Sequence, residues 1–311
     1  MDFSGVYPAL TTPFAADGSV SVEAIRGNIE RYNATGLAGY TVIGSTGESV
    51  LLSRKEIDTV WAAVKEAASP GKKLIAGTGA ESTAETIERT KRAAELGYHA
   101  ALVKTPYYYK PVYKSENYIA HYRKVADASP IPVLLYSVPQ FTGVSLEAAE
   151  VAALCQHPNI VGIKESSGHV QRIAEMVDAA SKSFQVLTGS ASMLFPSMTV
   201  GASGAILALA SALPELCVSV YDAVRSGDLR KARELETHIL PASKFIVSQG
   251  GIPGVKYAMD LVGYRGGNPR EPLLPASDSL KTAIRDFIGK LDAAGHAPKA
   301  YAASLSGSAR V

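Results

Sequence analysis

Short apolar runs recur along the chain about 20 to 35 residues apart and predict eight β-strands. The predicted strands cover residues 5–10, 39–43, 73–77, 100–104, 132–136, 160–164, 184–188 and 204–208. Their apolar residues are continuous rather than alternating, which is typical of strands buried on both faces. Most of the intervening stretches have helical periodicity. One predicted helix has Ser21 as its N-cap and Gly36 beyond its end, and another has Thr83 and Gly97 in the same roles.

Strands that alternate with helices eight times predict a closed parallel (β/α)8 barrel, the TIM barrel, over residues 1–224. The alternative is an open doubly wound sheet, which usually carries a glycine fingerprint after its first strand. The segment "TTPFAADG" after the first strand has none. The pattern after the eighth strand is helical, so residues 225–294 are expected to form a C-terminal helical extension that packs on the barrel. Residues 295–311 are small and polar and predict a flexible tail.

The composition indicates a soluble globular protein with a large core, since 47% of its 311 residues are hydrophobic and 19% are charged. The net charge is +2 and no basic block occurs, so neither nucleic acid nor an anionic membrane is an expected partner. No signal-peptide pattern and no long uncharged apolar run appears, which predicts no transmembrane helix. The only cysteines, Cys155 and Cys217, argue against a disulfide scaffold. A cytoplasmic location is expected.

The active site of such a barrel lies at the C-terminal ends of its strands, and two lysines end strands here. Lys164 directly follows the apolar run of residues 160–163. Lysine is seldom buried unless something pairs with it or uses it, so the stretch alone favours a solvent-exposed side chain over a nucleophile in a dry site. Lys104 is the rival. Because Thr105 and Pro106 turn the chain at once, Lys104 is expected to face solvent.

Two further strand ends carry groups that suit catalysis. The loop "GSTGES", residues 44–49, offers hydroxyls and backbone amides that suit an anion, or else forms a plain turn in which Ser45 or Thr46 caps the next helix. These two interpretations stay open. Tyr136 ends the fifth strand and can relay a proton if it is buried. Tyr107 and Tyr109 are interpreted as ordinary strand and interface residues.

Metal chemistry is disfavoured because no two of the six histidines have helical i, i+4 spacing and no cysteine cluster exists. A Gly-x-Ser-x-Gly elbow of the kind that serine hydrolases carry is also missing.

Five segments occur in the order "GSTGES", "TPYYYKP", "YSVPQFTG", "GIKESSG" and "GASGAI". Together they resemble the pyruvate-dependent class I aldolases of the dihydrodipicolinate synthase and N-acetylneuraminate lyase superfamily, from about residue 4 to residue 292. The resemblance implies a barrel with a C-terminal helical extension, assembled as a homotetramer that is a dimer of dimers. It implies 2-oxo acid and aldehyde substrates, and no cofactor or metal besides the covalent lysine–pyruvate imine.

The same resemblance assigns catalytic roles. It implies that Lys164 forms a Schiff base with the keto carbon of pyruvate and that Tyr136 relays protons. Thr46 would link Tyr136 to Tyr108, which a neighbouring subunit would contribute across the tight dimer interface. An amine must be neutral to attack a carbonyl, so the pKa of Lys164 is expected below the ordinary value of about 10.4, and burial acts in that direction.

The remaining residues implied by the resemblance bind substrate. Ser45 and Thr46 would hold the pyruvate carboxylate through hydroxyls and backbone amides. The carbonyl of Ile206 would face the site and accept a hydrogen bond. Gly189 and Phe141 complete the predicted substrate-binding set.

Position 141 bears on which member of the superfamily this is. Dihydrodipicolinate synthases have an arginine there that binds the carboxylate of aspartate semialdehyde, and Phe141 cannot make that contact. Other blocks, such as "IAGTGAEST" and "GIPGVKYAMDLVGYRGG", look closest to 4-hydroxy-2-oxoglutarate aldolases, which yield pyruvate and glyoxylate. That activity is the first prediction, although Phe141 also departs from the small polar residue expected there. Dihydrodipicolinate synthase, a sugar-acid lyase and a catalytically silent 2-oxo acid sensor are the alternatives.

Overall fold

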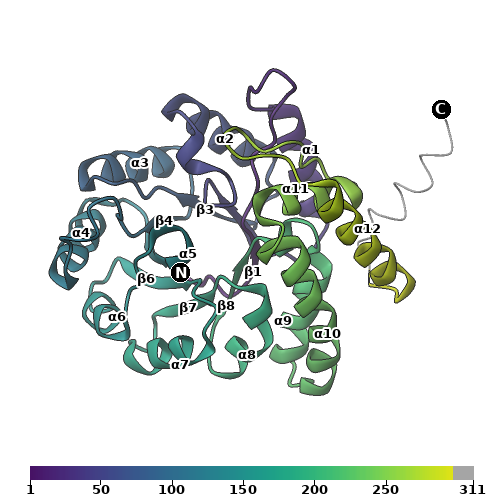
Figure 1. Cartoon of the computed structure of the whole chain (residues 1–311). Helices are drawn as coiled ribbons and strands as arrows, with labels where there is room; N and C mark the ends of the chain where they lie inside the picture. Colours follow the sequence, from purple (N-terminus) through teal and green to yellow (C-terminus); the bar gives the residue numbers. More distant parts are fainter. Residues whose placement is uncertain (297–311) are drawn as a thin grey trace.

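The structure is a computed structural model that describes residues 1–296. Eight parallel strands form one sheet in the order β1-β8-β7-β6-β5-β4-β3-β2 (Figure 1). The strands are β1 Gly5–Pro8, β2 Gly39–Val42, β3 Lys73–Gly77, β4 Ala100–Lys104, β5 Val133–Ser137, β6 Ile160–Glu165, β7 Gln185–Thr188 and β8 Gly204–Leu207. A bridge between Ala9 and Thr41 joins β1 to β2, and Leu10 N donates to Thr41 O at 3.0 Å. The sheet therefore closes on itself, and the predicted (β/α)8 barrel is confirmed.

Most of the helices surround the barrel as an outer ring, whereas α5 lies over its centre and α12 projects away from it (Figure 1). The helices are α1 Val22–Asn33, α2 Arg54–Ala67, α3 Thr83–Glu95, α4 Ser115–Ala128, α5 Pro139–Thr142, α6 Ala148–Leu154, α7 Val170–Ala179, α8 Leu194–Thr199, α9 Pro214–Arg225, α10 Leu229–Ala242, α11 Gly251–Leu261 and α12 Asp278–Ala293. Ser21 caps α1 as predicted, accepting a hydrogen bond from Ala24 N. The prediction that Thr83 caps α3 is wrong by one residue. Ser82 is the N-cap, and the Thr83 hydroxyl instead lies 2.9 Å from His121 Nδ1.

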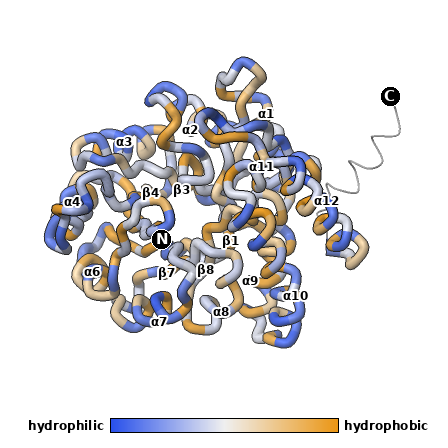
Figure 2. The backbone as a smooth tube through the Cα atoms, in the orientation of Figure 1, coloured by the Kyte–Doolittle hydropathy of each residue, from blue (hydrophilic) through white to orange (hydrophobic). Residues whose placement is uncertain are grey.

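Side chains of the strands fill two apolar layers. Alternate residues point into the barrel, where Tyr7, Leu102, Leu134, Leu187 and Ile206 form part of an inner cluster. The residues between them join a larger cluster under the helices. Hydrophilic stretches gather on the outer surfaces of the helices (Figure 2). Burial on both faces explains why the strands are continuous apolar runs in the sequence.

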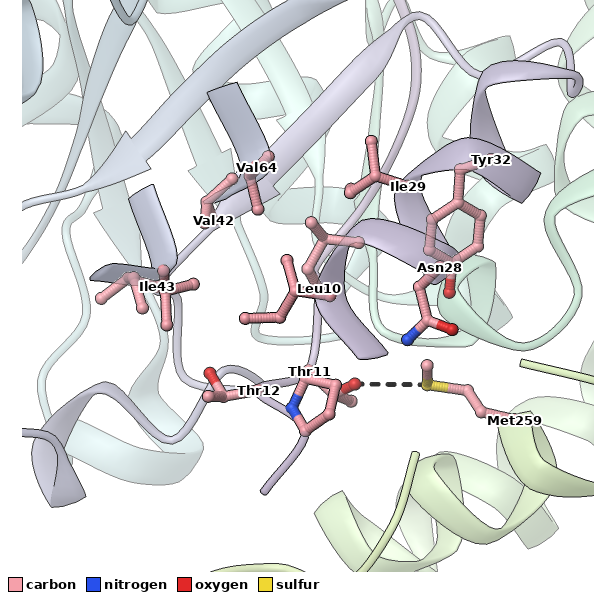
Figure 3. A pocket seen from close by; sticks show the side chains of 13 residues that line it. Leu10, Thr11, Thr12, Asn28, Ile29, Tyr32, Val42, Ile43, Val64 and Met259 are labelled. Carbon is pink, nitrogen blue, oxygen red and sulfur yellow. Dashed lines mark hydrogen bonds between the residues drawn. The ribbon is translucent and has the colours of Figure 1, made fainter. Parts of the chain in front are cut away.

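The C-terminal helices α10–α12 follow α9 and pack along one side of the barrel (Figure 1). Two contacts fix them to the first βα unit. The rings of Tyr32 and Tyr264 stack with centroids 4.5 Å apart, and Thr11 Oγ1 donates to Met259 Sδ at 3.3 Å (Figure 3). The pocket in Figure 3 has a volume of only about 10 Å³, room for about one water. These helices are therefore packed closely enough to contribute walls to a site at the barrel rim.

The boundary between the barrel and the C-terminal helical extension, placed between residues 224 and 225, stays a prediction. All but the first two residues of the predicted tail, 295–311, lie outside the described residues. Within residues 1–296, no helix has the length and apolar character needed to cross a membrane.

Candidate active site

Lys164 lies inside the barrel near the C-terminal end of β6, where its side chain is only 4% exposed. The solvent-exposed orientation that its stretch favoured on its own is therefore wrong. Tyr136 is its register partner on β5, and Lys164 Nζ lies 4.3 Å from the centroid of the Tyr136 ring. No residue in the described range 1–296 forms a hydrogen bond or ion pair with Lys164 Nζ. A buried amine without a partner is the arrangement in which lysine serves as a nucleophile.

Lys164 and Tyr136 share a cavity of about 430 Å³ at the barrel mouth. Its walls come from the strand ends and the loops after them, from the segment Ser243–Ser248 and from α11: Ser45, Thr46, Tyr136, Val138, Gln140, Phe141, Lys164, Ser166, Gly189, Ser190, Ala191, Ala208, Leu209, Val247, Ser248, Gly251, Ile252 and Val255. The structure thus brings together six of the residues predicted from the sequence. The cavity has room for a small keto acid and a second substrate.

The alternation of β6 decides which side chain enters the barrel. Ile163 belongs to the outer apolar layer, Lys164 points inward, and Glu165 points outward again. The Glu165 carboxylate accepts hydrogen bonds from Ser167 N and Oγ, and Arg172 Nε lies 3.6 Å away. Burial raises the pKa of Glu165. This carboxylate is therefore held on the helix side of the strand.

Gly189, directly after β7, leaves the space that Lys164 occupies. A Cβ at this position would lie 1.8 Å from Ser166 Oγ and 3.0 Å from Lys164 Cε. The first distance is shorter than any ordinary contact. Gly189 N also donates to Glu165 O at 2.6 Å, which holds the end of β7 close to β6. Glycine at this site is therefore a steric requirement of the lysine pocket.

Ser45 rather than Thr46 contacts the tyrosine. Ser45 Oγ lies 3.3 Å from Tyr136 OH, and either oxygen can be the donor. Thr46 also lines the cavity, and its hydroxyl has no hydrogen bond within residues 1–296, so the link from Thr46 to Tyr136 stays a prediction. Ile43, just before this loop, has a φ of 62°, so the chain turns sharply at the end of β2.

A buried ion pair behind this loop was missed by sequence reasoning. Glu48 Oε1 lies 2.6 Å from Lys256 Nζ, and both side chains are fully buried. Arg270 N donates to Glu48 Oε2 at 2.7 Å, and Lys256 Nζ donates to Asn268 O at 2.9 Å. Burial lowers the pKa of Lys256, and Glu48 opposes that shift. These contacts fasten the loop to the C-terminal helices. The only sequence signal was a lysine within the apolar stretch of α11.

Lys104 does not face solvent, so that prediction is also wrong. It is the register partner of Tyr136 on the opposite side from Lys164, and it points into the barrel mouth. Its Nζ donates to Gly79 O at 3.1 Å. Burial lowers the pKa of Lys104. The prediction assumed that the turn at residues 105–106 exposes the side chain of residue 104. Side chains alternate along a strand, however, so Lys104 points into the barrel on the same face as Leu102.

Three predicted residues lie at the margin of the cavity or away from it. Phe141, on the short helix α5, is 66% exposed and forms part of the rim. Tyr108 is 72% exposed, stacks edge-on against Tyr109 and is not in the cavity wall of its own chain. Ile206 is fully buried in the inner cluster, and the cavity wall after β8 comes from Ala208 and other residues further along.

Metal-binding donors do not cluster in the described part of the chain. No three His, Cys, Asp or Glu side chains among residues 1–296 come close enough together to hold a metal ion.

A closed barrel that holds a buried lysine beside a tyrosine at its C-terminal rim is the arrangement that a class I, lysine-dependent aldolase needs. The chain belongs to the dihydrodipicolinate synthetase family, whose model matches residues 2–291. It is thus an enzyme of the superfamily of class I pyruvate aldolases, as its five segments had indicated.

Similar proteins support the same assignment over the full barrel. A 4-hydroxy-tetrahydrodipicolinate synthase of Methanothrix thermoacetophila is 37% identical over 290 residues, which cover 93% of this chain and 97% of the relative. The enzyme of the same name from an Exiguobacterium species is 38% identical, with 91% and 96% covered. The structure of a dihydrodipicolinate synthase from Acinetobacter baumannii in complex with pyruvate aligns with a TM-score of 0.88 at 32% identity, covering 94% of this chain and 99% of that one.

Proposed function

We propose that this enzyme joins pyruvate to an aldehyde, or cleaves the product of that reaction, through an imine on Lys164. The observation that carries the proposal is the Lys164 amine, which is 4% exposed, lines a cavity of about 430 Å³ and has no hydrogen-bond or ion-pair partner among residues 1–296. The pyruvate complex of the similar Acinetobacter baumannii enzyme supports pyruvate as the first substrate.

The residues around the cavity suit each step. Lys164 Nζ attacks the keto carbon of pyruvate, and the carbonyl oxygen leaves as water. The protonated imine then withdraws electrons from the adjacent methyl carbon, which loses a proton to give an enamine. The enamine carbon attacks the aldehyde carbon, and the aldehyde oxygen takes up a proton. Water then adds to the imine carbon, the C–N bond breaks, and the product leaves while the Lys164 amine is regenerated. Tyr136 OH lies beside the amine and contacts Ser45 Oγ, so it is placed to carry these protons. The lysine itself supplies the electron sink, so the reaction needs no cofactor or metal.

The carboxylate of pyruvate needs its own binding groups. We propose that Ser45 and Thr46 hold it, because both line the cavity on the loop that follows β2. The buried pair of Glu48 and Lys256 fixes the end of that loop. A rigid loop positions substrate without an ordering cost at the moment of reaction.

Aspartate semialdehyde is the first candidate for the aldehyde, which would make the chain a 4-hydroxy-tetrahydrodipicolinate synthase. The names of its relatives, at 37% and 38% identity over more than 90% of the chain, favour this activity over the 4-hydroxy-2-oxoglutarate cleavage put first by sequence resemblance. The blocks "IAGTGAEST" and "GIPGVKYAMDLVGYRGG" keep the second activity as a candidate, because they look closest to the 4-hydroxy-2-oxoglutarate aldolases. Phe141 differs from the residue expected for either activity, so it does not rank the two.

Borohydride trapping tests the mechanism. The protein is incubated with pyruvate and sodium borohydride, digested, and its peptides are weighed. A reduced pyruvate adduct is expected on Lys164 and not on Lys104. An adduct on Lys104, or none, would remove the proposed mechanism. Turnover of pyruvate with aspartate semialdehyde, compared with cleavage of 4-hydroxy-2-oxoglutarate, then ranks the two activities. Tight pyruvate binding without turnover of any aldehyde would instead support a sensor.

We also propose that Tyr108 acts across a subunit interface in a tetramer. Tyr108 is 72% exposed and is not in the cavity wall of its own chain, and Tyr109 and Val112, close to it in sequence, are exposed as well. Sedimentation velocity measures the assembly state. A fully active monomer would contradict the proposal, and Tyr108→Phe is expected to lower kcat while leaving the assembly intact.

A further inference from the structure

Lys104 is a second partly buried lysine at the barrel mouth that the imine mechanism does not use. The strand register places Lys104, Tyr136 and Lys164 side by side on β4, β5 and β6, all pointing inward. Lys104 Nζ makes one hydrogen bond, to Gly79 O, and no ion pair with any residue in the range 1–296. An ammonium group has three N–H donors, so two remain available to a ligand. A desolvated cation with free donors is expected to attract an anion.

The surroundings of Lys104 are connected to the catalytic cavity. Lys104 lines a second cavity of about 250 Å³, and four residues of its wall, Ser45, Val138, Phe141 and Ile252, are shared with the cavity that holds Lys164. Among the residues that line the second cavity, Lys104 is the only cation, and the carboxylate of Glu48 is already paired with Lys256. The remaining wall is mostly apolar. An anionic group entering from the side of Lys164 therefore meets one unpaired charge.

We propose that Lys104 binds the carboxylate of the acceptor aldehyde and so supplies the cation that Phe141 does not. This inference rests on the proposed function, and it makes the enzyme selective for aldehydes that carry a carboxylate a few carbons from the reacting group. Strands lie about 4.8 Å apart, so the α-carbons of Lys104 and Lys164 are about 10 Å apart across β5. A four-carbon aldehyde acid has three C–C bonds of about 1.5 Å, and a hydrogen bond of about 3 Å to Lys104 Nζ extends its reach to about 7 to 8 Å. The flexible lysine side chains cover the remaining distance.

The test compares two aldehydes of equal length that differ in the carboxylate. Succinate semialdehyde carries it and butanal does not, and each is supplied with pyruvate to the wild-type enzyme and to Lys104→Met, which keeps the apolar stem. We expect kcat/KM for succinate semialdehyde to fall about 10- to 100-fold, the range for one hydrogen bond to a charged group, while the value for butanal changes less than about threefold. Lys104→Arg keeps the charge and is expected to retain the preference.

Two controls make the result decisive. Pyruvate trapping on Lys164 must persist in Lys104→Met, which shows that the variant is folded and that the imine forms. Loss of trapping in the wild type would refute the imine mechanism itself rather than the role of Lys104. With trapping intact, the proposal is overturned by equal losses for both aldehydes, by an unchanged preference in Lys104→Met, by a raised KM for pyruvate alone, or by a wild type that does not prefer succinate semialdehyde.

Discussion

Replacing Lys256 by methionine tests whether the loop after β2 depends on the C-terminal helices. Lys256 is fully buried, its Nζ lies 2.6 Å from Glu48 Oε1, and it donates to Asn268 O at 2.9 Å. Methionine has a similar length and fills the same space without the charge. The variant therefore leaves the Glu48 carboxylate buried without its cation, while disturbing the packing little.

The expected loss of stability is about 3–5 kcal/mol, the usual cost of removing one partner from a buried ion pair. Arg270 N still donates to Glu48 Oε2, which favours the lower end of that range. Unfolding in urea measures the loss. The single tryptophan, Trp61, is 1% exposed in α2 and its fluorescence reports the transition. With a slope of about 3 kcal/mol per M, the midpoint is expected to fall by about 1 M or more at matched protein concentration.

A double variant separates charge from packing. Glu48→Gln with Lys256→Met removes both charges, and it is expected to be more stable than Lys256→Met alone because no unpaired carboxylate remains. A single variant within about 1 kcal/mol of the wild type would refute the reasoning. So would a double variant whose loss equals the sum of the two single losses, since that result means the side chains do not interact.

Three further substitutions test the site and the core. Gly189→Ala is expected to lower kcat at least about 100-fold and to reduce pyruvate trapping, because the new Cβ would lie 2.8 Å from Ser166 Cβ, which rotation of the serine hydroxyl cannot relieve, and 3.0 Å from Lys164 Cε; full activity would contradict the steric argument. Tyr136→Phe is expected to lower kcat about 10²- to 10⁴-fold in steady-state assays, and a loss below tenfold would remove its hydroxyl from the proton path. Burial raises the pKa of Glu236 from its usual 4.5 to about 7, so the folded state keeps a proton that the unfolded state releases, and stability falls as pH rises through that window. Glu236→Gln is therefore expected to exceed the wild type by up to about 3 kcal/mol at pH 8 and to match it near pH 4, with the exposed Glu234→Gln as control; equal urea midpoints at pH 8 would refute this.

The barrel was predictable because both faces of every strand are buried. The runs at residues 73–77 and 100–104 match β3 and β4 without error, since an apolar stretch between two helices has few alternative folds. Helix ends were less certain. Ser82 and Thr83 are both good N-cap residues; in the structure Ser82 accepts from Glu85 N, and the Thr83 hydroxyl contacts His121, a partner far along the chain that no local pattern reveals.

The catalytic pair was predictable only in combination with a resemblance. Lys164 alone looks like a residue at the surface, and its burial depends on strands that are distant in sequence. Ser45 and Thr46 could not be ranked as the contact of Tyr136, because both carry a hydroxyl and only the folded chain shows that Ser45 Oγ lies 3.3 Å from Tyr136 OH. The pairing of Glu48 with Lys256 joins positions more than 200 residues apart, which no local pattern can reveal.

The register of β6 determines which mutations this enzyme can tolerate. β6 shifts its pairing with β5 between Val133 and Leu134, and beyond that point Lys164 faces the barrel while Glu165 faces the helices. Removal of one residue just before Lys164 would exchange the two, placing a carboxylate in the reaction chamber and the amine among apolar side chains outside it. Point substitutions around the barrel mouth can therefore change the preference for one aldehyde over another gradually. A one-residue deletion in β6, by contrast, would abolish imine formation at once, because the amine would no longer face the cavity.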